Sequence, residues 1–271
     1  MKSGKIILLI GISLIPLISW GTDFHQQEST DLNTIKLECL SVDQLDEIRN
    51  FPIRGTIHTS FIECKTELKE KLGNLKLSEQ QIVIVFLSIL SQSMAPFGTS
   101  KSIELKDLLK DKTLDCDNYA LLVGHFYKIF YNNPELSLRF VGFDGGAIGN
   151  HAQIFAEGKD GTILLDPTIG LVAKITFNQL LKGISLNESQ FMFIRVHRDR
   201  RIDVFSKKVI DAISKGKYQP SDLLYFLPST EEFIAFSKEV APLWEAKNYP
   251  ILIRRYPTPG SIALKKNLLK K

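Results

Sequence analysis

A thiol, an imidazole and a carboxylate occur in an order suited to covalent catalysis within residues 113–167. Cys116 follows Asp115, His151 lies in the segment NHAQIFAEG, and Asp166 ends the segment KDGTILLD. In such a set the imidazole takes the thiol proton and the acid orients the imidazole. Each residue alone has an ordinary structural explanation, because lone cysteines are usually core residues and Asp-Pro often ends a strand. Their occurrence in this order, each at the end of an expected element, favours catalysis.

The cysteine is expected at the start of a helix. Thr113 and Asp115 are both candidate N-caps, and apolar residues recur at helical spacing over residues 120–130. Unpaired backbone amides and the positive end of the helix dipole favour an anion at such a position. The sequence therefore predicts a stabilised thiolate at Cys116.

The histidine and the aspartate are expected on neighbouring strands. Three segments have strand composition: residues 137–143, 151–157 and 162–166. The connection GKDG at residues 158–161 predicts a hairpin between the last two. Pairing Glu157 with Thr162 makes His151 and Asp166 diagonal neighbours on one face, about 7–8 Å apart at the backbone. A hydrogen bond between the two side chains is then within reach.

The motifs DCDNYALL, NHAQIFA and ILLDPTIG together resemble the transglutaminase-like superfamily, a branch of the papain-like thiol enzymes. The resemblance covers residues 82–183, and the motifs occur in the family's order. It implies that Cys116 is the nucleophile, His151 the general base and acid, and Asp166 the residue that orients the imidazole. The chain departs from the family at Gln153, where many members have an aromatic residue. No oxyanion donor is evident upstream of Cys116, so its own backbone amide is the default donor.

The resemblance also implies the fold and the domain organisation. We expect an α+β fold of papain-like or transglutaminase-like type, with a helical N-terminal part packed on an antiparallel sheet. Ser78 and Gln81 form a capping-box pattern before an all-apolar run, which predicts a buried helix over residues 77–94, although a strand is an alternative. Residues 34–50 have loose helical spacing. Residues 34–186 would form the transglutaminase-like domain, and residues 187–271 a C-terminal α/β extension of unknown role.

The N-terminal segment predicts export. In residues 1–21, Lys2 and Lys5 precede a short apolar run and small residues, which is the pattern of a signal peptide. An uncleaved anchor is the alternative, and membrane association is expected only in that case. In the periplasm or outside the cell, Cys39 and Cys64 would form a disulfide and leave Cys116 as the free thiol. In a cytosolic protein both would be reduced.

Charge and residue spacing exclude several classes of partner. The net charge of +4 falls to +2 once residues 1–21, with two lysines and no acidic residue, are removed, so nucleic acid is not an expected partner. No set of cysteines and histidines has metal-ligand spacing, so we predict neither a metal nor a cofactor. The expected substrate is a protein, a peptide or an envelope polymer, cleaved or transferred at an amide bond through a thioester, with hydrolysis slightly favoured. The alternative is an inactive binding or scaffolding module of the cell envelope.

Overall fold

The computed structural model describes residues 34–50, 54–144, 151–182, 186–187, 189–196, 207–209, 211–212 and 222–245. The expected signal peptide and much of the C-terminal extension lie outside these ranges. The strands are β1 Thr34–Lys36, β2 Leu136–Asp144, β3 His151–Gly158, β4 Gly161–Asp166, β5 Leu171–Ala173, β6 Phe191–Arg195 and β7 Asp222–Leu227. The helices are α1 Val42–Asn50, α2 Arg54–Lys71, α3 Glu79–Met94, α4 Leu105–Leu108, α5 Cys116–Phe130, α6 Phe177–Lys182 and α8 Thr230–Glu245, with a short 3₁₀ helix η1 at Gly73–Leu75.

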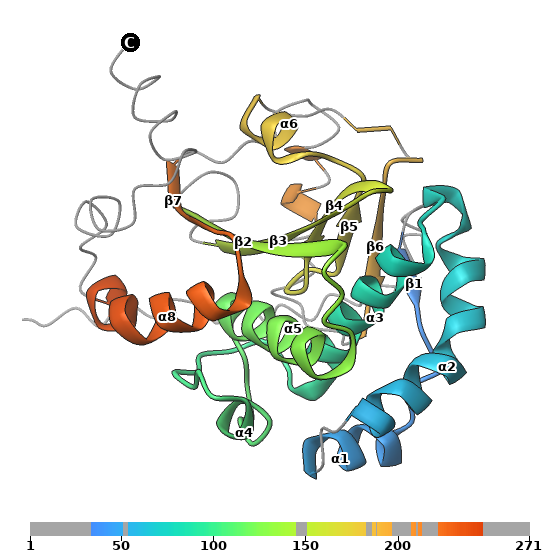
Figure 1. The fold of residues 1–271 in the computed structure, drawn as a ribbon, viewed down its shortest axis with the longest axis horizontal. Coiled ribbons are helices and arrows are strands. Elements are labelled where there is room, and N and C mark those ends of the chain that lie inside the picture. Colours follow the sequence, from blue (N-terminus) through green and yellow to red (C-terminus); the bar gives the residue numbers. More distant parts are fainter. Residues whose placement is uncertain are drawn as a thin grey trace, which may run out of the picture. The chain divides into compact units, whose positions relative to one another are not determined.

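The described strands form one sheet in the order β1-β6-β5-β4-β3-β2-β7. In this order β1 is parallel to β6, and every other pair of neighbouring strands is antiparallel. Figure 1 shows the helices α3 and α5 side by side next to the sheet, with α8 beside α5. The α+β prediction is confirmed at this level. The strand at residues 34–36 contradicts the helical spacing expected there, because pairing with β6 overrides a weak local pattern.

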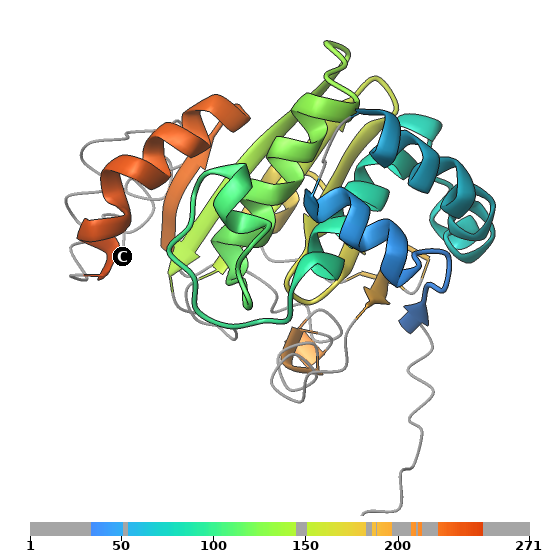
Figure 2. The same cartoon turned by 90° about the horizontal axis from the view of Figure 1, so that it is seen from below.

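The sheet buries side chains on both faces, because successive residues of a strand point to opposite sides. Ile154 and Leu165 belong to the larger core cluster, on the face covered by α3 and α5. Phe155 and Leu164 belong to a second cluster, which Leu180 of α6 joins from the other face. Figure 2 shows α5 running along the helical face of the sheet. The helix carrying Cys116 is therefore held against β3.

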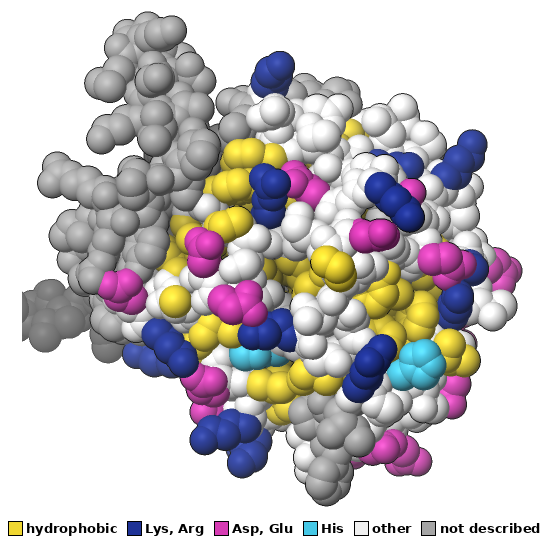
Figure 3. Space-filling model, in the orientation of Figure 1, with side chains coloured by type: hydrophobic (Ala, Val, Ile, Leu, Met, Phe, Trp, Pro, Cys, Tyr) yellow, Lys and Arg dark blue, Asp and Glu magenta, His cyan; other side chains and the backbone are white. Residues whose placement is uncertain are grey.

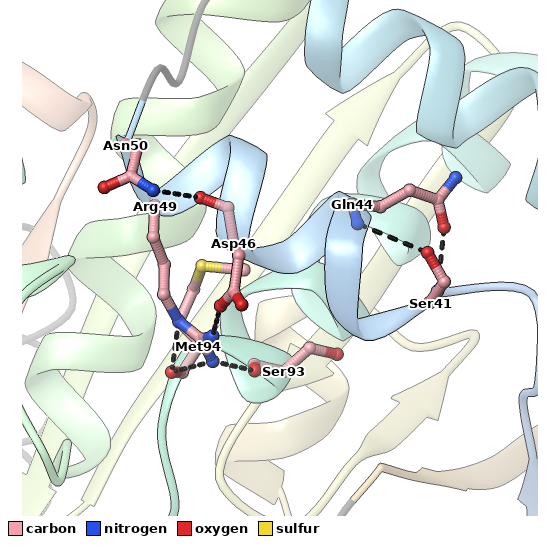
Figure 4. A network of polar contacts seen from close by, with 7 residues as sticks. All are labelled: Ser41, Gln44, Asp46, Arg49, Asn50, Ser93 and Met94. Carbon is pink, nitrogen blue, oxygen red and sulfur yellow. Dashed lines mark hydrogen bonds and ion pairs between the residues drawn. The ribbon is translucent and has the colours of Figure 1, made fainter.

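The helix α3 is the central element of the helical face, as the sequence predicted. Ser78 accepts a hydrogen bond from the backbone N–H of Gln81, and the Gln81 side chain accepts one from the Ser78 N–H, so the capping box is present. Every residue from Gln81 to Met94 is buried. At the other end Arg49 of α1 donates to the carbonyl oxygens of Ser93 and Met94, the latter at 2.8 Å (Figure 4). Both ends of the helix are thus satisfied by side chains.

A disulfide joins the segment before α1 to α2. Cys39 and Cys64 are bonded, with their Cα atoms 5.0 Å apart, and Cys116 is free, as predicted for an oxidising compartment. This pairing is compatible with export. Among the helices in the described ranges, none is long and apolar enough to cross a membrane.

Candidate active site

The helix α5 begins at Cys116 because Asp115 caps it. The Asp115 carboxylate accepts a hydrogen bond from the Asn118 N–H at 3.0 Å, and the Asn118 side chain accepts one from the Asp115 N–H at 3.0 Å. Asn118 is itself anchored, since its side chain donates to the carbonyl of Ser102. Of the two candidate caps, Asp115 is therefore the one used. Cys116 is the first helical residue and is half-buried.

The hairpin of β3 and β4 has the register that the sequence predicted. Glu157 pairs with Thr162, and the turn consists of Lys159 and Asp160. The Nε2 atom of His151 lies 2.5 Å from Oδ2 of Asp166, and both side chains are buried. The expected contact between imidazole and carboxylate is therefore present, and Nδ1 is the ring nitrogen turned away from Asp166.

Asp166 is fully buried and accepts four hydrogen bonds, which fix its orientation. Oδ2 accepts from His151 and from the Gln153 side chain, the latter at 3.0 Å, and Oδ1 accepts from the backbone N–H groups of Thr168 and Ile169. Gln153 is the residue at which this chain departs from the family pattern. The sequence contained a signal for its role, since Gln153 lies on the same strand face as His151 and Asp166 in the predicted register.

The turn after Asp166 depends on glycine. Gly170 donates its N–H to the Asp166 carbonyl and has φ of +74°, a region that favours glycine. A Cβ at this position would lie 1.9 Å from the carbonyl oxygen of Ile194 in β6. The close approach of β6 thus requires Gly170, and the resulting turn aims the Thr168 and Ile169 amides at the carboxylate.

The thiol meets the sheet at the start of β3. The backbone N–H of Ala152 lies beside the Cys116 thiol and lowers its pKa, whereas the charge of Asp166 raises it. His151 is the residue before Ala152 on β3. Successive side chains of a strand point to opposite faces of the sheet, so His151 points to the face opposite that of Ala152. The helix end and the first residues of β3 therefore share one rim of the sheet. At this rim His151 and Asp166 contact each other, and Cys116 reaches it from the face covered by the helices.

The surroundings of the thiol disfavour its ionised form. Burial raises the pKa of Cys116 well above its usual value, and the carboxylates of Asp117, Asp115 and Asp166 raise it further. The Ala152 amide alone among the named neighbours acts in the opposite direction. The expectation of a stabilised thiolate is therefore wrong for the resting protein, because desolvation and like charge outweigh the helix end.

Two further carboxyl groups surround Cys116. Burial and the neighbouring Asp117 raise the pKa of Asp115 to about 7, against the hydrogen bonds that it accepts as a cap. Burial also raises the pKa of Asp117, while the Tyr225 hydroxyl and the charge of His151 act in the opposite direction. The ligand atoms of Asp115, Cys116 and Asp117 lie within 4.8 Å of one another. Because both carboxylates already accept hydrogen bonds from the protein, we assign no metal to them.

The site is distant from a hollow of about 440 Å³ between the end of α2 and the start of α3, whose lining includes Lys69 and Lys76. Gln81 at this end of α3 reaches the Gly161 carbonyl, at the turn of the hairpin, whereas His151 lies at the other end of β3. In Figure 3, acidic and basic side chains intermingle over the described part of the visible face. The chain matches no family model, no curated protein and no solved structure.

Proposed function

We propose that the protein is an exported cysteine-dependent enzyme of transglutaminase-like fold, which acts on amide bonds through a thioester. One observation carries the proposal: His151, the first residue of β3, contacts the buried Asp166 at 2.5 Å, and the amide of the next residue, Ala152, lies beside the Cys116 thiol. Asp166 accepts from Nε2, so Nδ1 is the nitrogen that takes the thiol proton. In this proposal, two strands and one helix end hold the nucleophile, the base and the orienting acid.

The reaction begins with a protonated thiol. As the Cys116 sulfur attacks the amide carbonyl carbon, its proton passes to Nδ1 of His151, the C–S bond forms and the carbonyl electrons move to oxygen. Collapse of this intermediate breaks the C–N bond, and His151 returns the proton to the leaving amine. Water then attacks the thioester while His151 accepts its proton, the C–S bond breaks, and the proton returns to sulfur. An amine in place of water would give transfer.

The oxyanion formed in each step needs a donor. The backbone N–H of Cys116, at the first position of α5, has no acceptor within its own helix. The amide of Asn118 is committed to the Asp115 carboxylate. The Cys116 amide is therefore the donor that we assign to the oxyanion.

The substrate class follows from export and from the chemistry. A protein, a peptide or an envelope polymer in the periplasm or outside the cell supplies the amide, and hydrolysis is slightly favoured over transfer. The competing function is a binding or scaffolding module that has kept the fold without activity. The raised pKa of Cys116 favours this alternative, because a thiol that stays protonated at every step cannot attack.

Acylation by p-nitrophenyl acetate separates the two functions. We expect the wild-type protein to form a thioester on Cys116, detected by mass spectrometry of the peptide that contains it. Cys116→Ala should form none, and His151→Ala should acylate about 100-fold more slowly or worse. His58→Ala, at an exposed histidine on α2, is the matched control and should keep the wild-type rate. Equal acylation rates in wild type and His151→Ala would favour the binding module.

A further inference from the structure

The C-terminal part of the chain reaches the candidate site through Tyr225. Strand β7 pairs with β2 at the edge of the sheet, where Tyr225 lies opposite Gly142. A Cβ on Gly142 would lie 2.1 Å from the Tyr225 ring, so the glycine leaves the space that the ring occupies. Phe233 and Phe236 of α8 contact the same ring, and Tyr225 is 1% exposed. The ring is thus held by packing on several sides.

The hydroxyl of this ring has a specific partner next to the nucleophile. It donates a hydrogen bond to Oδ1 of Asp117 at 2.8 Å. Asp117 faces Cys116 and Asp115 on its own helix segment, Tyr225 on β7, and the charge of His151 on β3. From β4, Asp166 acts on the thiol as well. Asp117 is therefore a second carboxylate that interacts with both the proposed nucleophile and the proposed base.

We propose that Tyr225 is a positioning residue of the thiol chemistry: its hydroxyl holds Asp117 as a carboxylate beside Cys116 and His151, so that β7 completes the active site. The inference rests on the proposed function and deepens it, since it gives the C-terminal extension a role. The charge on Asp117 acts differently before and during attack. It opposes a resting thiolate, and it favours the imidazolium that forms when His151 takes the proton.

Two opposite changes follow when that charge is removed. Without the carboxylate, Cys116 ionises at lower pH, so simple alkylation by iodoacetamide becomes faster near neutral pH. Proton transfer to His151 is less favourable, so acylation by p-nitrophenyl acetate becomes slower. A residue that only supports the fold would slow both reactions or change neither. The opposed directions therefore separate positioning from structural support.

The experiment measures both reactions across pH in the full chain. Tyr225→Phe keeps the ring and removes the hydroxyl, and Asp117→Asn removes the charge itself. We expect alkylation of Cys116 near pH 7 to be about tenfold faster in Asp117→Asn, from a midpoint about one pH unit lower, and several-fold faster in Tyr225→Phe. Acylation should fall several-fold or more in both. Tyr127→Phe is the matched control, because its hydroxyl bonds the carbonyls of Asn133 and Leu136 away from the site.

The outcomes separate this inference from the proposed function. If Tyr225→Phe leaves the alkylation midpoint where the wild type and Tyr127→Phe have it, Tyr225 does not hold Asp117 and the inference fails. A midpoint that moves in Asp117→Asn but not in Tyr225→Phe overturns it equally. If His151→Ala acylates as fast as the wild type, the proposed function itself fails, whatever the tyrosine variants do.

Discussion

Replacing Asp166 with asparagine should stop the chemistry by forcing the wrong tautomer of His151. The backbone amides of Thr168 and Ile169 point at Oδ1, at 3.1 and 3.4 Å, so the amide oxygen of an asparagine must occupy that position. Its NH₂ group then takes the place of Oδ2 and faces Nε2 of His151. Nε2 has to accept this hydrogen bond, and the imidazole proton moves to Nδ1. Nδ1 can then no longer take the thiol proton.

The size of the effect follows from this tautomer. Triads whose orienting acid is changed to an amide lose about 10⁴ in rate, or about 5 kcal/mol of transition-state stabilisation. Gln153 adds a smaller cost in folding, because its NH₂ group loses the Oδ2 acceptor that it shares with His151. A buried donor left without its acceptor costs about 1–3 kcal/mol. We therefore expect a folded protein with little activity.

The assay is the rate of thioester formation with p-nitrophenyl acetate, together with urea unfolding to show that the variant is folded. Nitrogen chemical shifts of His151 report which ring nitrogen carries the proton. Asp160→Asn, at the exposed turn of the same hairpin, makes the same chemical change and should keep the wild-type rate. An Asp166→Asn protein that acylates within about tenfold of the wild type, or that keeps its proton on Nε2, would refute this reasoning.

Three further predictions concern stability. Replacing Cys39 and Cys64 together with serine should lower the free energy of unfolding by about 3 kcal/mol, because the disulfide joins residues separated by 25 positions. The Tm should fall by roughly 6–12 °C, and an unchanged Tm would contradict this prediction. Gly170→Ala should lower the free energy of unfolding, measured in urea, by about 2 kcal/mol or more, because the new Cβ meets β6. It should also slow acylation, because the turn after Asp166 is disturbed. Stability equal to the wild type would show that this turn tolerates a side chain. The pKa of Asp115 is raised from 3.8 to about 7, so between these pH values the folded state holds a proton that the unfolded state has released. The contribution of Asp115 to the free energy of unfolding therefore falls as the pH rises from about 4 to about 7. Asp115→Asn keeps a capping oxygen without the charge, so its free energy of unfolding should depend less on pH. Near pH 8 the variant should be more stable than the wild type by on the order of 1 kcal/mol, a figure kept small by partial solvation. A free energy of unfolding with the same pH dependence as the wild type would count against this prediction.

The elements of the site were predictable because their signals are local. The capping pattern before Cys116 and the register of the hairpin each depend on residues a few positions apart, and both are present in the structure. The contact between His151 and Asp166 then follows from the alternation of strands. The pairing of Cys39 with Cys64 followed from the odd number of cysteines and the expected compartment.

The parts that the sequence did not predict depend on distant pairings. Strand β1 lies beside β6, far along the chain, and its three residues carry no pattern strong enough to identify a strand. The contact of Tyr225 with Asp117 joins residues separated by 108 positions. It depends on β7 lying at the edge of the sheet, and on Gly142 leaving room for the ring. Neither condition can be derived from local spacing.

Three effects compete to set the protonation state of Cys116: the helix end, burial of the thiol and the neighbouring carboxylates. Their magnitudes decide the outcome. A helix end stabilises a nearby anion by about 0.3–1 kcal/mol, which is less than one pKa unit. Burial shifts a pKa by as much as 3–5 units, and a nearby carboxylate by one or more. Asp115 and Asp117 flank the cysteine in the sequence, so the effect of like charge was already visible there, whereas the larger effect of burial was not. A thiol in such surroundings stays protonated until a base removes the proton during attack. The precise placement of His151 by Asp166 and Gln153 therefore matters more to the proposed reaction than the helix end does.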